Sequence, residues 1–168
     1  MKKFILTLLL PILIVGCKLP SSDPEAANRE VVEKYFAALD AQDYEVLNEL
    51  MDEAFIIPTR VIDGPARAVG RDAAFELIRG FYGSFPDYTH DIEEIIAEGN
   101  RVAVRVVLRG THLGEYNGVA PTGKEVKYAG TYMATVIDGV LTEVWSLDDE
   151  INLYKQLGME LTSSSDGN

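Results

Sequence analysis

The sequence predicts an α+β fold in which helices come first and pack on one face of a curved, mixed or antiparallel sheet. Apolar residues repeat at helical spacing from Ala27 to Tyr82 and at alternate positions from Tyr88 onward. The tight-turn pairs Gly99-Asn100 and Asp138-Gly139 divide the second part into consecutive strands. Helices followed by a run of strands favour this class over alternating βαβ units.

Three helices are expected before the sheet. The first begins at Asp23-Pro24, where a capping carboxylate precedes a proline at the first helical position, and its apolar stripe extends to Leu39. Asp43 is expected to cap a second, shorter helix, and the third is expected over Arg71 to Tyr82. Each helix has one apolar side, so all three can pack against the sheet.

Four strands are expected after the helices, with the bounds Tyr88 to Glu98, Arg101 to Leu113, Glu125 to Ile137 and Val140 to Leu147. A last helix over Ile151 to Leu157 is expected to end at Gly158. We expect one folded domain over residues 23–161, followed by a polar, disordered tail over residues 162–168.

Composition excludes several classes of function. The chain has 168 residues, 15 basic and 27 acidic side chains, and a formal net charge of -12. A chain this acidic repels a phosphate backbone, so nucleic acid is not expected as a partner. One cysteine cannot form an internal disulfide or a thiolate cluster, and His90 and His112 lack the close spacing of helical zinc ligands. No metal is expected.

The first 16 residues have the layout of a secretory signal. Lys2 and Lys3 precede the run Phe4 to Val15, whose 12 residues fall short of the ~20 needed to span a bilayer. The last residues of this segment, Ile14-Val15-Gly16-Cys17, resemble the lipobox of bacterial lipoproteins. A core helix is the alternative, but the segment has no polar face.

This resemblance implies that Cys17 becomes the first mature residue and carries a diacylglyceryl anchor, followed by a lipidated tether over residues 17–22. Several acyl chains on one residue hold a protein stably on a membrane. Lys18 stands where the inner-membrane retention signal has aspartate, so a Gram-negative host would send the protein to the periplasmic side of the outer membrane. Plain secretion, with a free Cys17 thiol, is the alternative.

Alternation along the strands assigns side chains to the two faces of the sheet. The inner face of the second strand is expected to hold Val102, Val104, Val106, Leu108 and His112. The third strand adds Val126, Tyr128, Tyr132, Ala134 and Val136. The fourth adds Leu141, Glu143, Trp145 and Leu147, with Asp149 next in the series. A β-bulge in a strand would move its later side chains to the opposite face of the sheet.

An apolar face with a few polar tips is typical of a small-molecule pocket. We expect Val104, Val106, Tyr128, Tyr132 and Trp145 to line it. The pocket would receive two groups able to transfer protons, the side chains at positions 112 and 149. Each has a structural alternative: the aromatic residues can be core, the histidine can be structural, and the aspartate can cap the last helix.

Several motifs resemble the SnoaL-like polyketide cyclase family of the nuclear-transport-factor-2-like superfamily. They are GTHLGEYNGVAPTGKEVKYAGTYM from Gly110, then IDGVLTEVW with Asp149 four residues after Trp145, and LYKQLG at the end. The resemblance covers roughly Glu30 to Gly158. It implies a cone-shaped α+β barrel with a deep apolar cavity, commonly paired as a homodimer through the sheet.

The cyclases of this family close a ring by an intramolecular aldol reaction without metal or cofactor. The resemblance implies Asp149 as the general acid/base and His112 as the oxyanion partner. Val144 and Ala120 depart from the family pattern. We therefore expect an envelope lipoprotein that binds a small, apolar, carbonyl-containing molecule and acts on it by acid/base chemistry. The alternative is a non-catalytic binding or assembly module. Catalysis through Asp149 requires its carboxylate to face the cavity, not only to cap a helix.

Overall fold

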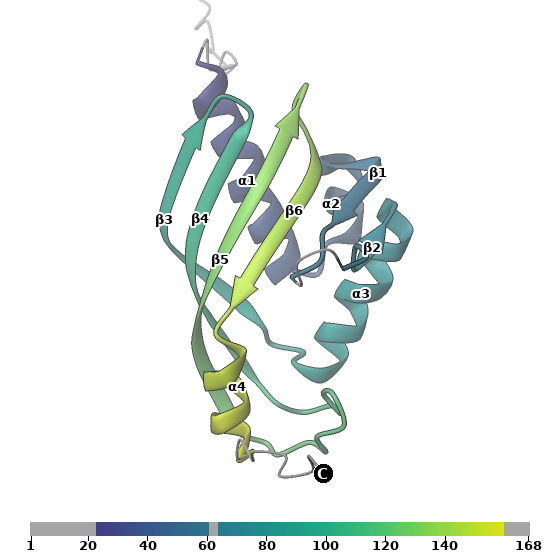
Figure 1. Ribbon diagram of the computed structural model, residues 1–168, viewed down its shortest axis with the longest axis vertical. Helices are drawn as coiled ribbons and strands as arrows, with labels where there is room; N and C mark the ends of the chain where they lie inside the picture. The colour runs from purple at the N-terminus through teal and green to yellow at the C-terminus, as the bar shows by residue number, and fades with distance from the viewer. Residues whose placement is uncertain (1–22, 61–63, 160–168) are drawn as a thin grey trace, which may run out of the picture.

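The structure is a computed structural model that describes residues 23–60 and 64–159 (Figure 1). Its helices are α1 (Pro24–Asp40), α2 (Tyr44–Leu50), α3 (Arg71–Ser84) and α4 (Glu150–Leu157). Its strands are β1 (Met51–Ile57), β2 (Ala68–Val69), β3 (Thr89–Glu98), β4 (Arg101–Thr111), β5 (Glu125–Ile137) and β6 (Val140–Asp148). The predicted signal segment, the tether and the polar tail lie outside the described residues.

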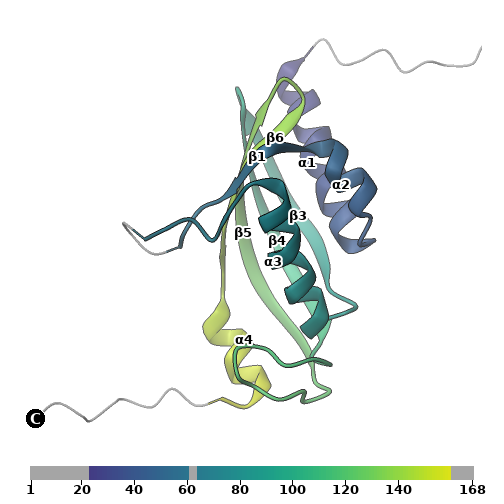
Figure 2. The same cartoon turned by 90° about the vertical axis from the view of Figure 1, so that its right-hand side faces the viewer.

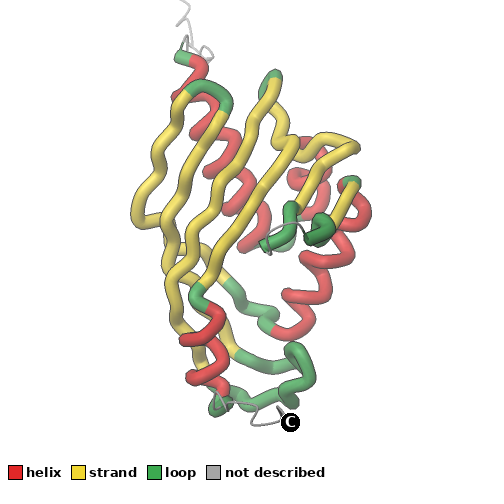
Figure 3. Tube along the Cα trace, in the orientation of Figure 1, coloured by secondary structure: helices red, strands yellow, loops and turns green. Residues whose placement is uncertain are grey.

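The strands form one open, mixed sheet in the order β2-β1-β6-β5-β4-β3 (Figure 3). Strand β1 runs parallel to β6, and the other neighbouring pairs are antiparallel. Figure 2 shows α1, α2 and α3 on the same side of the curved sheet. The predicted α+β class, with N-terminal helices on a curved mixed sheet, is confirmed.

Local signals place most element ends where the sequence predicts them. Asp23 caps α1 by accepting a hydrogen bond from the Glu25 backbone N–H, and Asp43 caps α2 in the same way. The turn between β5 and β6 has positive φ at Asp138 and Gly139, as a two-residue hairpin requires. Gly158 ends α4 in the left-handed conformation.

The sequence pattern does not predict β1 and β2 as strands. The short apolar stretch of β1 is followed by Pro58, and β2 has only two residues, so neither gives a clear alternation. Strand β1 gains its place through pairing with β6, about 90 residues later in the chain. Pairing partners so distant in sequence leave no local pattern.

A bulge near the start of β6 overturns the predicted alternation of that strand. The register with β5 shifts between Thr135 and Val136, so one extra β6 residue is inserted after Leu141. From that point the inner face holds Val144, Ser146 and Asp148. The inward placement predicted for Glu143, Trp145, Leu147 and Asp149 is therefore wrong. A one-residue shift moves every later side chain to the opposite face.

The core lies between the inner face of the sheet and the three N-terminal helices. The alternating residues Val102, Val104, Val106 and Leu108 of β4 are each at most 1% exposed. Phe36 of α1 and Phe85, just after α3, pack into the same apolar cluster. Within residues 23–60 and 64–159, no helix combines the length and apolar character needed to cross a membrane.

Candidate active site

A cavity of about 560 Å³ opens between the inner face of the sheet and helices α1 and α3. Apolar side chains such as Leu39, Ile57 and Phe81 form part of its wall. The described wall also contains six tyrosines: Tyr35, Tyr82, Tyr88, Tyr116, Tyr128 and Tyr132. Charged side chains line it as well, namely Arg60, Arg67, Glu76, Glu115, Asp148 and Glu150. A wall that combines aromatic rings with charged groups suits a small molecule that has both an apolar body and oxygen atoms.

Among the carboxylates of this wall, that of Asp148 lies over Gly130 of the neighbouring strand. A Cβ atom at Gly130 would stand 2.7 Å from Asp148 Oδ1, so only glycine leaves room for the carboxylate there. The Asp148 side chain is 11% exposed. Its Oδ1 atom is buried and has no hydrogen-bond partner among the described residues.

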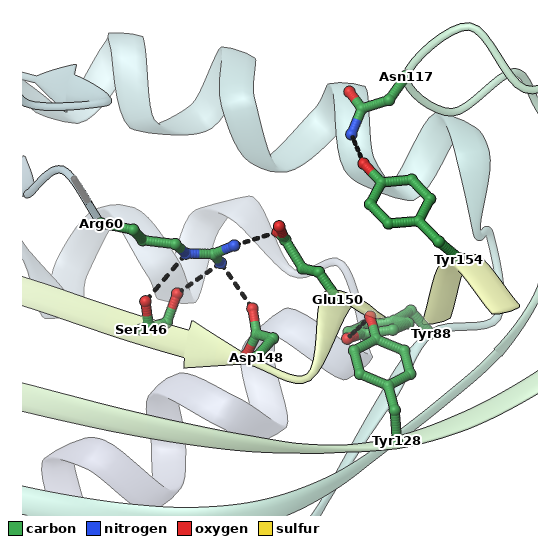
Figure 4. Close-up of polar contacts among 8 residues, drawn as sticks. All are labelled: Arg60, Tyr88, Asn117, Tyr128, Ser146, Asp148, Glu150 and Tyr154. Carbon is green, nitrogen blue, oxygen red and sulfur yellow. Dashed lines mark hydrogen bonds and ion pairs between the residues drawn. The ribbon is translucent and has the colours of Figure 1, made fainter. Parts of the chain in front are cut away.

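The other oxygen of this carboxylate is held by Arg60 (Figure 4). Arg60 Nη2 donates to Asp148 Oδ2 at 2.6 Å and to Ser146 Oγ at 2.9 Å, and Nε donates to the Ser146 carbonyl. Arg60 Nη1 also pairs with Glu150. Four contacts fix the guanidinium, which in turn fixes the orientation of the Asp148 carboxylate.

Burial raises the pKa of the Asp148 carboxyl above its ordinary value, against the lowering effect of Arg60. The nearby Glu150 charge raises it further. Burial opposes the charge on Arg60, but the two carboxylates raise the pKa of its guanidinium overall. A carboxyl with a raised pKa is a stronger base than an ordinary aspartate, so it is better able to take a proton from a ligand and return it.

Two phenols close to Asp148 form a hydrogen-bonded pair. The hydroxyls of Tyr88 and Tyr128 are 2.6 Å apart (Figure 4). Burial raises the pKa of both, so both stay protonated at neutral pH. One proton forms the mutual hydrogen bond, and the other hydroxyl proton is available to a ligand oxygen. The ring of Tyr88 also needs Gly110, whose Cβ position lies 3.0 Å from Tyr88 Cδ2.

His90 on β3 lies in the wall of the same cavity. Its ring nitrogen Nδ1 is 2.6 Å from Oδ1 of Asp40, the last residue of α1. The backbone N–H of His90 donates to Asp40 Oδ2 at 3.2 Å. The described residues contain no group of three or more His, Cys, Asp or Glu side chains arranged for a metal ion. The cavity thus presents a carboxylate, an imidazole and a phenol pair.

The chain matches the family model of the SnoaL-like polyketide cyclases over residues 29–157. That range includes the strands and helices that build the cavity described above. The chain belongs to the SnoaL-like polyketide cyclase family. No curated protein sequence matches this chain significantly.

Solved structures of similar fold agree with membership of the SnoaL-like family. A proposed SnoaL-like polyketide cyclase from a Jannaschia species is 26% identical, with 84% of this chain and 98% of that one covered and a TM-score of 0.75. AclR, a proposed hydroxylase from Streptomyces galilaeus, is 25% identical over 84% and 91% of the two chains, with a TM-score of 0.72. IdmH, a proposed polyketide cyclase from Streptomyces antibioticus, is 28% identical over 79% and 99%, with a TM-score of 0.68.

The aspartate that matches the SnoaL-like pattern, Asp149, lies outside the cavity. Its side chain is exposed and caps α4 by accepting a hydrogen bond from the Asn152 backbone N–H at 3.1 Å. Trp145 is half-buried and pairs with Met133 on the outer face of the sheet. The bulge in β6 accounts for both positions, and it brings Asp148 inward instead.

His112, the other residue implied by the SnoaL-like pattern, is fully buried but absent from the described cavity wall. Its Nδ1 accepts the Thr122 backbone N–H at 3.3 Å and lies 3.1 Å from Thr122 Oγ1. Its ring stacks on Phe85. Val104 and Val106, also predicted to line the pocket, are buried core residues outside the described cavity wall. Tyr128 and Tyr132 lie in its wall.

The sequence pattern does not indicate most polar residues of the wall, among them Arg60, Tyr88, His90 and Asp148. Two glycines inside strands were the signal that could have located two of them. Glycine in a strand interior marks a close approach by another group, and Gly110 and Gly130 make room for Tyr88 and Asp148. Nothing in the sequence pattern indicates Arg60, since it lies in a loop between β1 and β2.

Proposed function

We propose that the cavity binds a small apolar molecule containing a carbonyl group, and that Asp148 transfers a proton at the carbon next to that carbonyl. The observation that carries this proposal is a buried carboxylate with one unpartnered oxygen beside two protonated phenols. Protonated phenols stabilise negative charge as it develops on a carbonyl oxygen. The same group of residues needs no cofactor for this chemistry.

The proposed step balances within the side chains of the cavity. The Asp148 carboxylate takes a proton from the carbon next to the carbonyl. The C–H electron pair forms the carbon–carbon double bond of an enolate, and the carbonyl π pair moves to oxygen. The free hydroxyl of the Tyr88–Tyr128 pair donates a hydrogen bond to that oxygen. Return of the proton from Asp148 restores the carboxylate.

Exchange of hydrogen for deuterium in β-tetralone, an apolar cyclic ketone, tests this step. The purified protein is incubated with β-tetralone in heavy water, and loss of the α-hydrogen signal is followed by proton NMR. We expect exchange above the buffer rate, and Asp148→Asn should slow it by at least about 100-fold, the range of a general base.

Asp149→Asn is the matched control, because it removes the neighbouring charge outside the cavity. Asparagine caps a helix as well as aspartate does, so this variant should fold normally and exchange at nearly the wild-type rate. Equal exchange in wild-type protein and Asp148→Asn would refute the role of Asp148. Binding of β-tetralone without any exchange would leave a non-catalytic binder.

We also propose that the protein is an envelope lipoprotein anchored through Cys17. The layout of Lys2, Lys3, the apolar run and the lone cysteine supports this proposal. Labelling of expressing bacteria with an alkyne fatty acid should mark the wild-type protein and not Cys17→Ala. No incorporation into the wild-type protein would refute the anchor, and secretion without the anchor would then place the protein outside the membrane.

An assembly role is the second candidate, and the outer face of the sheet favours it. Met133 and Leu147 are 37% and 55% exposed there, near the half-buried Trp145. We propose that a second copy of the chain covers this face in a homodimer. Sedimentation of the wild-type protein should give a dimer, and Leu147→Glu should give a monomer because a charge there opposes burial. A monomeric wild-type protein would refute it.

A further inference from the structure

The Asp40–His90 pair is unusual for a contact that only stabilises the fold. Asp40 is the last residue of α1, where the helix dipole disfavours a negative charge. Both of its oxygens are used by His90, one by the ring and one by the backbone N–H. A neutral hydrogen-bond acceptor would be more favourable at this end of the helix. We therefore attribute the negative charge of Asp40 to its pairing with the His90 imidazole.

This pairing fixes the proton on one ring nitrogen of His90. A carboxylate only accepts hydrogen bonds, so Nδ1 carries the proton and donates it to Asp40. All hydrogen bonds of the ring to other described residues run through Nδ1. The second nitrogen, Nε2, is then left with a free lone pair in a residue that lines the cavity. It can accept a proton from a ligand.

His90 is also close to the groups that would hold the carbonyl. Its ring centroid is 5.1 Å from that of Tyr88 and 5.8 Å from that of Tyr132. His90 and Tyr128 both pair in register with Leu108, from opposite sides of β4. The His90 ring also lies near enough to Asp148 that, when the ring is protonated, it lowers the pKa of that carboxyl. One small molecule can therefore touch the imidazole, the phenol pair and the carboxylate.

We propose that His90 is a second proton-transfer residue of the cavity, with Asp40 as its positioning residue, and that the ligand is a β-hydroxy carbonyl compound. This inference rests on the proposed function and names its substrate class. A lone pair on Nε2 requires a donor on the ligand, and in an apolar carbonyl compound that donor is a hydroxyl. The short distance from His90 to the phenol pair suits a hydroxyl two carbons from the carbonyl.

The cleavage of such a compound balances as follows. His90 Nε2 takes the hydroxyl proton, and the oxygen electron pair forms a new carbonyl. The bond between the α- and β-carbons breaks, and its electron pair forms an enolate whose oxygen accepts a hydrogen bond from the phenol pair. Protonated Asp148 gives its proton to the α-carbon, and a water molecule carries the proton of His90 back to Asp148. Addition is the reverse of these steps.

Diacetone alcohol, a small β-hydroxy ketone, tests the inference because its cleavage releases only acetone. Acetone is measured by proton NMR for wild-type protein, His90→Gln and His112→Gln. We expect acetone release above the buffer rate, and His90→Gln should reduce it by at least about 10-fold, since acid/base groups contribute about 100-fold or more. His112→Gln removes the histidine outside the cavity wall and should leave the rate within about twofold.

Exchange into β-tetralone, which has no hydroxyl, separates this inference from the proposed function. His90→Gln should reduce that exchange far less than it reduces cleavage, because the Asp148 carboxylate takes the α-proton itself. Cleavage of diacetone alcohol at the same rate by wild-type protein and folded His90→Gln would overturn the inference while exchange still supports Asp148. The inference is also overturned if the wild-type protein exchanges hydrogen in β-tetralone but does not cleave diacetone alcohol. If the wild-type protein does not exchange hydrogen for deuterium in β-tetralone, the proposed function itself is overturned.

The role of Asp40 is tested by a readout that a purely structural contact would not change. The chain has two histidines, so nitrogen NMR of the imidazole rings gives two sets of signals, and those of His90 vanish in His90→Gln. Wild-type His90 should carry its proton on Nδ1, and diacetone alcohol should shift its Nε2 signal. Asp40→Asn should move proton occupancy toward Nε2 and slow acetone release. An unchanged Nε2 signal on ligand addition would overturn the inference even if His90→Gln fails to fold.

Discussion

The two histidines and the two neighbouring aspartates of this chain divide between two regions that are held together in different ways. His112 and Asp149 contact residues 10 and 3 positions away in the sequence. His90 and Asp148, in the cavity wall, are held by residues 50 and 88 positions away. The first region is fixed by local backbone contacts, and the second by side chains that the fold brings together.

This difference shows why the residues that match the family motif are not those in the cavity. Asp149 satisfies a backbone N–H at the start of α4, and the Nδ1 of His112 accepts a backbone N–H in the loop between β4 and β5. Both contacts define element ends, so a structural role explains their place in the pattern. Asp148 Oδ1 and His112 Nε2 are both buried without a described hydrogen-bond partner, but only Asp148 lies in the cavity wall, where a ligand can reach the residue.

Filling the space beside Asp148 should have the largest effect on exchange among the substitutions that follow. In Gly130→Ala the new Cβ would stand 2.7 Å from Asp148 Oδ1 and 2.8 Å from Leu108 Cδ1. We expect the carboxylate to move and β-tetralone exchange to fall by at least about 10-fold, with about 1–3 kcal/mol of lost stability from overpacking. Exchange NMR and urea unfolding measure the two effects.

Gly83→Ala is the matched control for this substitution. Gly83 lies in α3, and beyond its own stretch of helix no described atom is within 4 Å of its Cβ position. Alanine favours helix over glycine by up to about 1 kcal/mol. This variant should exchange at the wild-type rate and unfold at slightly higher urea concentration. If Gly130→Ala also exchanges at the wild-type rate, the position of the carboxylate over Gly130 does not matter for chemistry.

The fold was predictable from sequence wherever its signals are local. The caps at Asp23 and Asp43, the Asp138-Gly139 turn and the change of period at Tyr88 each involve only a few adjacent residues. The short strand β1 was not predictable, because its partner β6 lies in the last third of the chain. The class of the fold follows from the order of its elements, and this order is visible in the sequence.

The cavity wall was predictable only in part. Alternation along β5 places Tyr128 and Tyr132 on the inner face because that strand keeps its register with β4 throughout. Alternation along β6 gives the wrong aspartate because one bulge residue reverses the faces. Arg60 and His90 depend on contacts across the molecule, with Asp148 and with Asp40, so no spacing rule could have paired them.

Removing the cap at Asp149 should affect stability and leave the cavity chemistry intact. Asp149→Ala loses the hydrogen bond to the Asn152 backbone N–H, which should cost about 1 kcal/mol of stability. Urea unfolding measures this loss, and β-tetralone exchange should stay within about twofold of the wild-type rate. Asp149→Asn should restore the stability. A loss of exchange in both variants would show that the two regions are coupled.

Removing the charge of Arg60 should change the pH dependence of exchange in the cavity. Burial raises the pKa of Asp148, and Arg60 acts against it, so Arg60→Gln should raise that pKa further. Exchange needs the ionised carboxylate, and its rise with pH should therefore move to higher pH in this variant. A series of exchange rates between about pH 5 and pH 9 measures the shift. Arg79→Gln, whose ion pair with Glu76 is exposed, should leave the profile unchanged.

The smallest expected effect is the pH dependence of stability that Asp148 contributes. Its pKa is raised in the folded state, so between the unfolded pKa of about 3.9 and the folded pKa the folded chain binds the proton more tightly. Its stabilising contribution is complete below that range and is lost as pH rises through the folded pKa. Asp148→Asn lacks this proton, so the free energy of unfolding of the wild-type protein should fall relative to that of Asp148→Asn as pH rises from about 4 through the folded pKa. Urea unfolding of both proteins across this range measures the difference. A relative gain by the wild-type protein would mean that Arg60 outweighs burial and that Asp148 acts as a structural ion pair.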